Sequence, residues 1–171
     1  MIRVFPAQPT ISMSNSSEII KPILVAGLGN ILFSDEGIGI RVVRNLQEKS
    51  APRPQVEFFE AGTGGMKLLH TISHREKAVF VDCAKMDSEP GTLCRFSDEE
   101  VRSAKKLPGF SLHEADLLEI IGLARKIEAC PRKLVIFGIE PFSIEPGEEI
   151  SPILSRRLDD YEAAVEKELQ V

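Results

Sequence analysis

The stretch Ile23–Ile40, which reads ILVAGLGNILFSDEGIGI, decides the fold class of this 171-residue chain. It begins with a short apolar run that ends at the glycine turn Gly27–Gly29. After a loop that closes with Asp35 and Glu36, an apolar helical pattern starts at about Gly37. A buried strand, a glycine turn and a helix are therefore expected, and this order is typical of an open α/β sheet.

The rest of the chain continues this alternation of apolar strands and amphipathic helices. We expect strands at about 22–27, 56–59, 78–81, 92–96 and 134–138, and helices at about 37–48, 65–73, 111–128 and 151–170, with a short helix after Ser97. The strand at 92–96 follows its predecessor without a crossover helix, so it is expected to be antiparallel. The predicted fold class is α/β, a three-layer α/β/α sandwich with a mostly parallel, twisted five-stranded sheet and one antiparallel edge strand.

Length and composition indicate one globular domain. Residues 1–20 are polar and contain Pro and Ser, so we expect a disordered N-terminal extension there and a single α/β domain at 21–171. The net charge of −5 argues against nucleic acid as a partner. No apolar run approaches the ~20 residues of a membrane span, and residues 1–17 lack the apolar core of a secretory signal. Three cysteines without a C-x-x-C pair suit the free thiols of the cytoplasm.

The glycine loop does not match the common phosphate-binding motifs. A dinucleotide fingerprint requires G-x-G-x-x-G, but Leu32 stands at the third glycine position, and no Walker A sequence follows. Asp35 and Glu36 at the helix start would repel a pyrophosphate by on the order of 4 kcal/mol. Glu60 could still mimic a ribose-binding acid, so a nucleotide site stays open as an alternative.

Acidic residues follow three of the predicted strands. Glu36 follows the first strand, Glu60 ends the second, and Asp82 ends the third. If the strands are parallel, the three carboxylates gather at the edge where open α/β sheets bind ligands. Ser34 or Asp35 can cap the following helix. We interpret Asp35 as the cap and Glu36 as a ligand.

His113 is the histidine best placed to join these acids. It opens a helix, within the capping-box pattern Ser111–Glu114, and a helix N-terminus keeps an imidazole in the neutral form that binds metals. Two carboxylates and one imidazole suit Zn, Ni, Mn or Fe(II) and leave coordination positions open. His70 and His74 lie near the end of a predicted helix, where a solvated histidine is favoured, so a structural role is preferred for them.

Taken together, these residues resemble those of the NiFe-hydrogenase maturation endopeptidases, which trim the C-terminus of the hydrogenase large subunit. The resemblance covers about residues 23–169. It rests on a set of short motifs: Gly27-x-Gly29-Asn30, Asp35-Glu36-Gly37-x-Gly39, Gly62-Thr63-x-Gly65, Val81-Asp82, His113 before a helix, and Gly138-Ile139-Glu140-Pro141 with Ile144-Glu145-Pro146-Gly147.

The resemblance implies roles for the candidate residues. In that family an acid of the first loop, an acid after the third strand and a later histidine bind nickel, and these positions are Glu36, Asp82 and His113 here. The nickel is expected to be that of the substrate's metal centre, and no nucleotide cofactor is expected. Glu60 stands where the family often has Asp in D-G-G-T, and it is a candidate general base.

The resemblance also implies the activity and the partner. The expected function is an endopeptidase that removes the C-terminal extension of a nickel-loaded large-subunit precursor, as a cytoplasmic monomer with no membrane or nucleic-acid partner. Glu36, Asp82 and Glu60 are the candidate catalytic residues, and aspartic-type and metal-assisted hydrolysis both stay open. The glycine turns 27–30 and 62–65 are expected to let the partner's backbone approach.

A different class of function remains open beside the endopeptidase. The Rossmann-like strand–turn–helix start and the lack of an obvious nucleophile also fit a non-catalytic nucleotide- or metal-binding module, such as a nickel chaperone.

Overall fold

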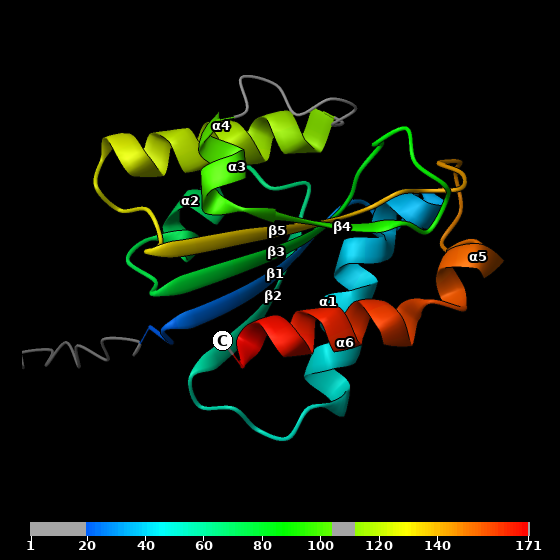
Figure 1. The fold of residues 1–171 in the computed structure, drawn as a ribbon, viewed down its shortest axis with the longest axis horizontal. Helices are drawn as coiled ribbons and strands as arrows, with labels where there is room; N and C mark the ends of the chain where they lie inside the picture. Colours follow the sequence, from blue (N-terminus) through cyan, green and yellow to red (C-terminus); the bar gives the residue numbers. More distant parts are fainter. Residues whose placement is uncertain (1–19, 104–111, 171) are drawn as a thin grey trace, which may run out of the picture.

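The protein is built on one five-stranded sheet with helices on both faces (Figure 1). The computed structural model describes residues 20–103 and 112–170, with residues 101–103 and 112–116 described by their backbone alone. The strands are β1 (Ile23–Leu28), β2 (Val56–Gly62), β3 (Lys77–Cys83), β4 (Leu93–Ser97) and β5 (Lys133–Ile139). The helices are the 3-10 helix η1 (Ser34–Gly37), α1 (Ile38–Lys49), α2 (Met66–Ile72), α3 (Asp98–Ser103), α4 (Leu112–Lys126), α5 (Pro152–Ser155) and α6 (Leu158–Leu169).

The strand order is β2-β1-β3-β5-β4. β1, β2, β3 and β5 pair in parallel, while β4 pairs with β5 in the antiparallel sense. The predicted α/β sandwich with one antiparallel edge strand is therefore confirmed. None of the described helices has the length and apolar character needed to cross a bilayer.

Alternating side chains of β3 divide the core into two halves. Ala78 and Phe80 pack in the cluster that includes residues of α2 and α4, while Val79 and Val81 pack in the cluster of α1 and α6. Successive side chains of a strand point to opposite faces, so each residue of β3 can be assigned to one layer. The whole strand is buried, as its continuous apolar run predicts.

The last helical stretch is two helices rather than the single one predicted at 151–170. Ser151 caps α5 as expected, since its Oγ accepts the N–H of Leu154 at 3.5 Å. The chain then forms a 3-10-type turn, in which the N–H of Arg157 donates to the carbonyl of Leu154 at 3.0 Å. A new helix, α6, starts at Leu158. Leu154 of α5 and Tyr161 of α6 both pack in the core.

The turn after β2 also differs from the prediction. The strand runs on to Gly62, and α2 begins at Met66 behind Gly65, which makes no side-chain cap bond. Gly62, Gly64 and Gly65 all have positive φ, the conformation that glycine adopts without strain, and they form the turn between β2 and α2. The predicted capping box at Ser111 and nearly all of the predicted N-terminal extension lie outside the described residues.

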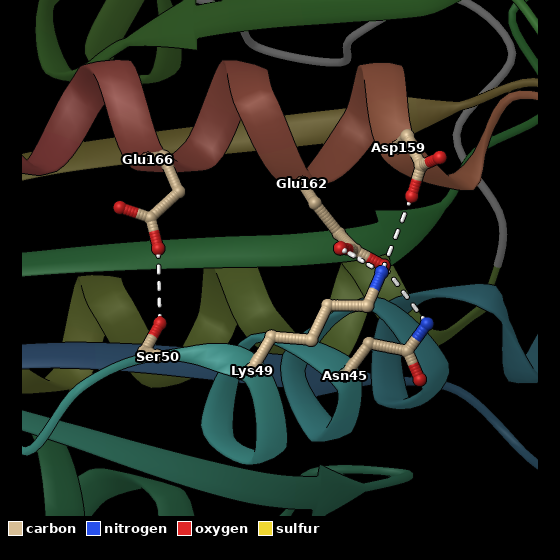
Figure 2. A network of polar contacts seen from close by, with 6 residues as sticks. All are labelled: Asn45, Lys49, Ser50, Asp159, Glu162 and Glu166. Carbon is tan, nitrogen blue, oxygen red and sulfur yellow. Dashed lines mark hydrogen bonds and ion pairs between the residues drawn. The ribbon is translucent and has the colours of Figure 1, made fainter.

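A polar seam joins α1 to α6 (Figure 2). The buried carboxylate of Glu162 accepts bonds from Asn45 at 2.8 Å and from Lys49 at 2.7 Å. Lys49 also contacts the exposed Asp159, and Ser50 donates to Glu166 at 3.0 Å. These contacts fix the C-terminal helix against the helix that follows the glycine loop.

We expect Glu162→Gln to lower the free energy of unfolding by roughly 1–2 kcal/mol, because a buried charge-assisted bond is lost. Urea denaturation at neutral pH measures the change. Asp159→Asn is the matched control, since it removes the exposed contact of the same lysine and should leave stability unchanged. Equal losses of unfolding free energy in the two variants would contradict the conclusion that Glu162 provides most of the stabilisation from this seam.

Candidate active site

Asp82 lies near the carboxyl end of β3, fully buried in the sheet. By strand alternation it shares the face of Ala78 and Phe80, which is the face covered by α2 and α4. Its Oδ1 accepts the N–H of Cys83 at 2.8 Å. Its Oδ2 is buried and has no hydrogen-bond partner among the residues that the structure describes. A buried carboxylate oxygen without a partner is costly, so it points to a ligand or a proton at this place.

Burial raises the pKa of Asp82 to about 7, and the nearby carboxylate of Glu36 raises it too, against the opposing effect of the Cys83 N–H. The charged form is disfavoured because it loses its water and faces a like charge. A carboxyl group that titrates near neutral pH can both give and take a proton. The structure thus places the carboxylate of Glu36 close enough to the buried carboxyl group of Asp82 for the two charges to interact.

Close backbone packing in the β1–α1 connection positions Glu36 near Asp82. A side chain at Gly29 would collide with the main-chain oxygen of Glu36, and one at Gly27 would collide with the backbone of Gly39. These glycines therefore serve close packing within the protein, and the prediction that 27–30 admits a partner's backbone is wrong. At Gly62 and Gly65, by contrast, the space for a side chain is empty to 4 Å, so that turn is open.

Asp35 is not the helix cap that the sequence suggests. Neither η1 nor α1 has a side-chain cap bond. The fully buried carboxylate of Asp35 instead accepts three backbone N–H groups of the β5–α5 loop, from Phe142 at 2.9 Å, Ser143 at 3.1 Å and Ser151 at 2.6 Å. Sequence reasoning missed this role because its partners lie more than a hundred residues away in the chain.

Glu60 is not brought to Glu36 and Asp82. Its two carboxylate oxygens accept hydrogen bonds from the Nε and Nη2 groups of Arg44 on α1, at 3.0 Å and 2.8 Å. The guanidinium holds the pKa of Glu60 below its usual value, which makes the carboxylate a weaker base. Glu60 therefore lies on the α1 side of the sheet, whereas Asp82 lies on the α2 and α4 side.

His113 belongs to the first turn of α4. In Figure 1 this end of α4 lies above the edge at which the parallel strands end, and α4 covers the face that carries Asp82. The side chain of His113 lies outside the described residues. Of the other two histidines, both are exposed, and His74 has a positive φ of 59° in the turn before β3.

Two oxygen donors for a cation lie at this edge, the carboxylates of Glu36 and Asp82. Among the side chains that the structure describes, no group of three metal-ligating residues is gathered. Two carboxylates, Glu36 and Asp82, are close enough for their charges to interact, and one buried oxygen of Asp82 lacks a partner. Oxygen donors with an added imidazole are ligands that nickel and related ions accept.

The β1–α1 loop offers little to a phosphate group. The N–H groups of Leu32, Phe33 and Glu36 each donate to acceptors inside the same loop. The N–H of Ser34 donates to the carbonyl of Gly147 at 2.6 Å. A phosphate cradle needs such N–H groups to point at the ligand, so the geometry does not favour the nucleotide-binding alternative.

A family model described as hydrogenase maturation protease matches residues 40–168. The chain belongs to the hydrogenase maturation protease family. It is 34% identical over 138 residues to the hydrogenase 2 maturation protease of Escherichia coli, which covers 80% of this chain and 84% of that protein. It is 30% identical over 149 residues to the hydrogenase expression/formation protein HupD of Rhodobacter capsulatus, which covers 86% of this chain and 71% of that protein.

A solved structure agrees with these sequence matches. The hydrogenase maturating endopeptidase HybD from E. coli superposes with a TM-score of 0.79 at 32% identity, over 86% of this chain and 91% of that one. The likeness supports an endopeptidase role for this maturation protease. The buried carboxyl group of Asp82 lies close to the half-buried Glu36 at the carboxyl end of the parallel strands of this fold.

Proposed function

We propose that this maturation protease cleaves the C-terminal extension from a nickel-loaded NiFe-hydrogenase large-subunit precursor in the cytoplasm, and that it recognises the precursor's nickel with Glu36, Asp82 and His113. The observation that carries the proposal is the buried Oδ2 of Asp82, which has no hydrogen-bond partner among the described residues and lies beside Glu36 at the edge where such sheets bind ligands. The first turn of α4, which contains His113, lies over the same edge.

The nickel is part of the substrate in this proposal. Three ligands from one protein leave coordination positions free, so the ion can be shared with the precursor that carries it. A divalent ion supplies charge that polarises a carbonyl or acidifies a water. A precursor without nickel brings no positive charge to Glu36 and Asp82, so it gains none of the attraction that a nickel-loaded precursor gains.

Asp82 supplies proton transfer near the scissile bond. In the metal-free protein its pKa of about 7 leaves it partly protonated at neutral pH, and nickel would displace that proton and leave a carboxylate that can take one up. Aspartic-type and metal-assisted hydrolysis both use a carboxyl group in this state. Glu60 is held by Arg44 on the other face of the sheet, so the proposal assigns proton transfer to Asp82.

Apolar side chains around the same edge provide a docking surface for the precursor. Most of the exposed large apolar side chains that the structure describes lie on the loops after β1 and β5 or at the start of α2, namely Ile31, Leu32, Phe33, Met66 and Phe142. Burial of such side chains is the main favourable term of protein association. The open glycine turn at 62–65 lies on this surface and leaves room for a partner's backbone.

We expect Leu32→Asp to raise the KM for the precursor about 10-fold with little change in kcat, because burial of a leucine side chain is worth about 1.5–3 kcal/mol. Steady-state cleavage of the purified precursor measures both constants. Ile127→Asp is the matched control, since Ile127 is 54% exposed against 56% for Leu32 but lies beyond the far end of α4. An equal rise in KM for the two variants would show that Leu32 is not part of a docking surface for the precursor.

Single substitutions of the nickel-recognising residues test the proposed site. Glu36→Gln and His113→Ala are each expected to reduce cleavage of the nickel-loaded precursor by more than about 100-fold, because loss of residues that only support a ligand already costs about 10–100-fold. Gel separation of precursor and mature subunit gives the readout. His70→Ala, at an exposed histidine of α2, should cleave as the wild type does. Normal cleavage by both site variants would refute the assignment.

A further inference from the structure

Asp35 accepts hydrogen bonds from residues outside its own turn. All three of its N–H partners, on Phe142, Ser143 and Ser151, belong to the loop between β5 and α5. The next residue in the chain is Glu36, whose carboxylate acts on Asp82. Asp35 therefore ties the turn that carries Glu36 to a second loop at the same edge of the sheet.

Ser34 strengthens the same junction. Its Oγ donates to the carbonyl of Ser143 at 3.0 Å and accepts the N–H of Glu145 at 3.0 Å. The backbone adds a bond from the N–H of Gly147 to the carbonyl of Leu32 at 2.8 Å. Ser34 has a positive φ of 41°, which a side chain other than glycine adopts at a cost, and these contacts hold it there.

The clamped loop forms the wall of a cavity beside the candidate site. Ser34 and residues 142–143, 145–149 and 151 line a space of about 480 Å³. Exposed Phe142, one of the apolar side chains of the docking surface, stands on this wall. The clamp thus sets the distance between the carboxylate of Glu36 and the loop that would meet the precursor.

We propose that Asp35 is a positioning residue for proteolysis, which holds Glu36 in place by anchoring the β5–α5 loop and does not itself touch the substrate. The inference rests on the proposed function, since it acts through Glu36. The buried charge suits this task, because one carboxylate can accept several N–H groups and bonds to a charged acceptor are the stronger ones. Only one of the two Asp35 oxygens remains an acceptor once the residue is changed to asparagine.

The test is Asp35→Asn, with steady-state cleavage of the nickel-loaded precursor as the readout. We expect kcat to fall by about 10–100-fold, the range found when residues that support a ligand are removed, while KM changes less than about 3-fold. Glu162→Gln is the matched control, because it also weakens a buried, hydrogen-bonded carboxylate but lies in the α1–α6 seam. It should keep the wild-type kcat.

A second variant keeps the test decisive if Asp35→Asn does not fold. Ser34→Ala removes the side-chain half of the junction and leaves Asp35 intact, so kcat should fall in the same direction by a smaller factor. A wild-type kcat in the folded variants, a rise in KM alone, or an equal loss in Glu162→Gln would overturn the inference. If Glu36→Gln and Asp82→Asn also cleave normally, the proposed function itself fails. If those two are inactive, only the role of Asp35 is refuted.

Discussion

The Asp82→Asn variant is expected to lose cleavage of the precursor by more than about 100-fold and yet to fold normally. Asparagine fills the same space and still offers an oxygen to the N–H of Cys83. It brings no negative charge to the place where the Oδ2 of Asp82 is buried without a partner, and it cannot exchange a proton near pH 7. The loss should exceed the roughly 10–100-fold that residues supporting a ligand contribute.

Cleavage of the nickel-loaded precursor, followed by mass spectrometry of the released peptide, measures the effect. Asp159→Asn is the control, because it makes the same chemical change at an exposed position on α6 and should cleave at the wild-type rate. A circular dichroism spectrum matching the wild type shows that the fold is intact. Retained cleavage by folded Asp82→Asn would exclude the residue from the site.

The second large effect is the contribution of Asp82 to the pH dependence of the free energy of unfolding. Burial raises the pKa of Asp82 from 3.8 to about 7, so between these values the folded protein holds a proton that the unfolded chain has released. Stability falls with rising pH wherever the folded state binds more protons. For metal-free protein, Asp82 should therefore lower the free energy of unfolding as pH rises from about 4 to 7, by on the order of 4 kcal/mol in total.

The difference between wild type and Asp82→Asn isolates this contribution, because all other titrating groups are common to both. Urea denaturation at pH 4, 5, 6 and 7 should show the variant gaining stability relative to the wild type across the series. At pH 7 the variant should be the more stable protein, although it is the inactive one. Parallel stability curves would contradict the raised pKa.

Most of the fold could be predicted because each layer leaves its own pattern in the sequence. The run at 78–81 is apolar at every position, and such a run indicates a strand buried on both faces. The missing crossover helix before 92–96 predicted the antiparallel pairing of β4. The two-part end of the chain could not be predicted, because Leu154, Leu158 and Tyr161 fit one helical stripe as well as they fit α5 and α6.

The candidate site could be predicted only where side-chain direction follows from position. Asp82 ends an apolar strand, and its place at the sheet edge follows from that alone. The direction of the Glu60 side chain could not be predicted, because Phe58 and Phe59 are consecutive apolar residues and the sequence does not show which face of the sheet each one takes. The role of Asp35 was hidden as well, since its partners lie 107 to 116 positions further along the chain.

The strand order has a consequence for the time at which the enzyme becomes active during its synthesis. β5 is the last strand to be made, yet it lies between β3 and β4. Until residues 133–139 leave the ribosome, β4 has no strand to pair with, and the loop that binds Asp35 follows β5 in the chain. Domains fold as units as the chain emerges, so the site is completed only after β5 and the loop that follows it have been made.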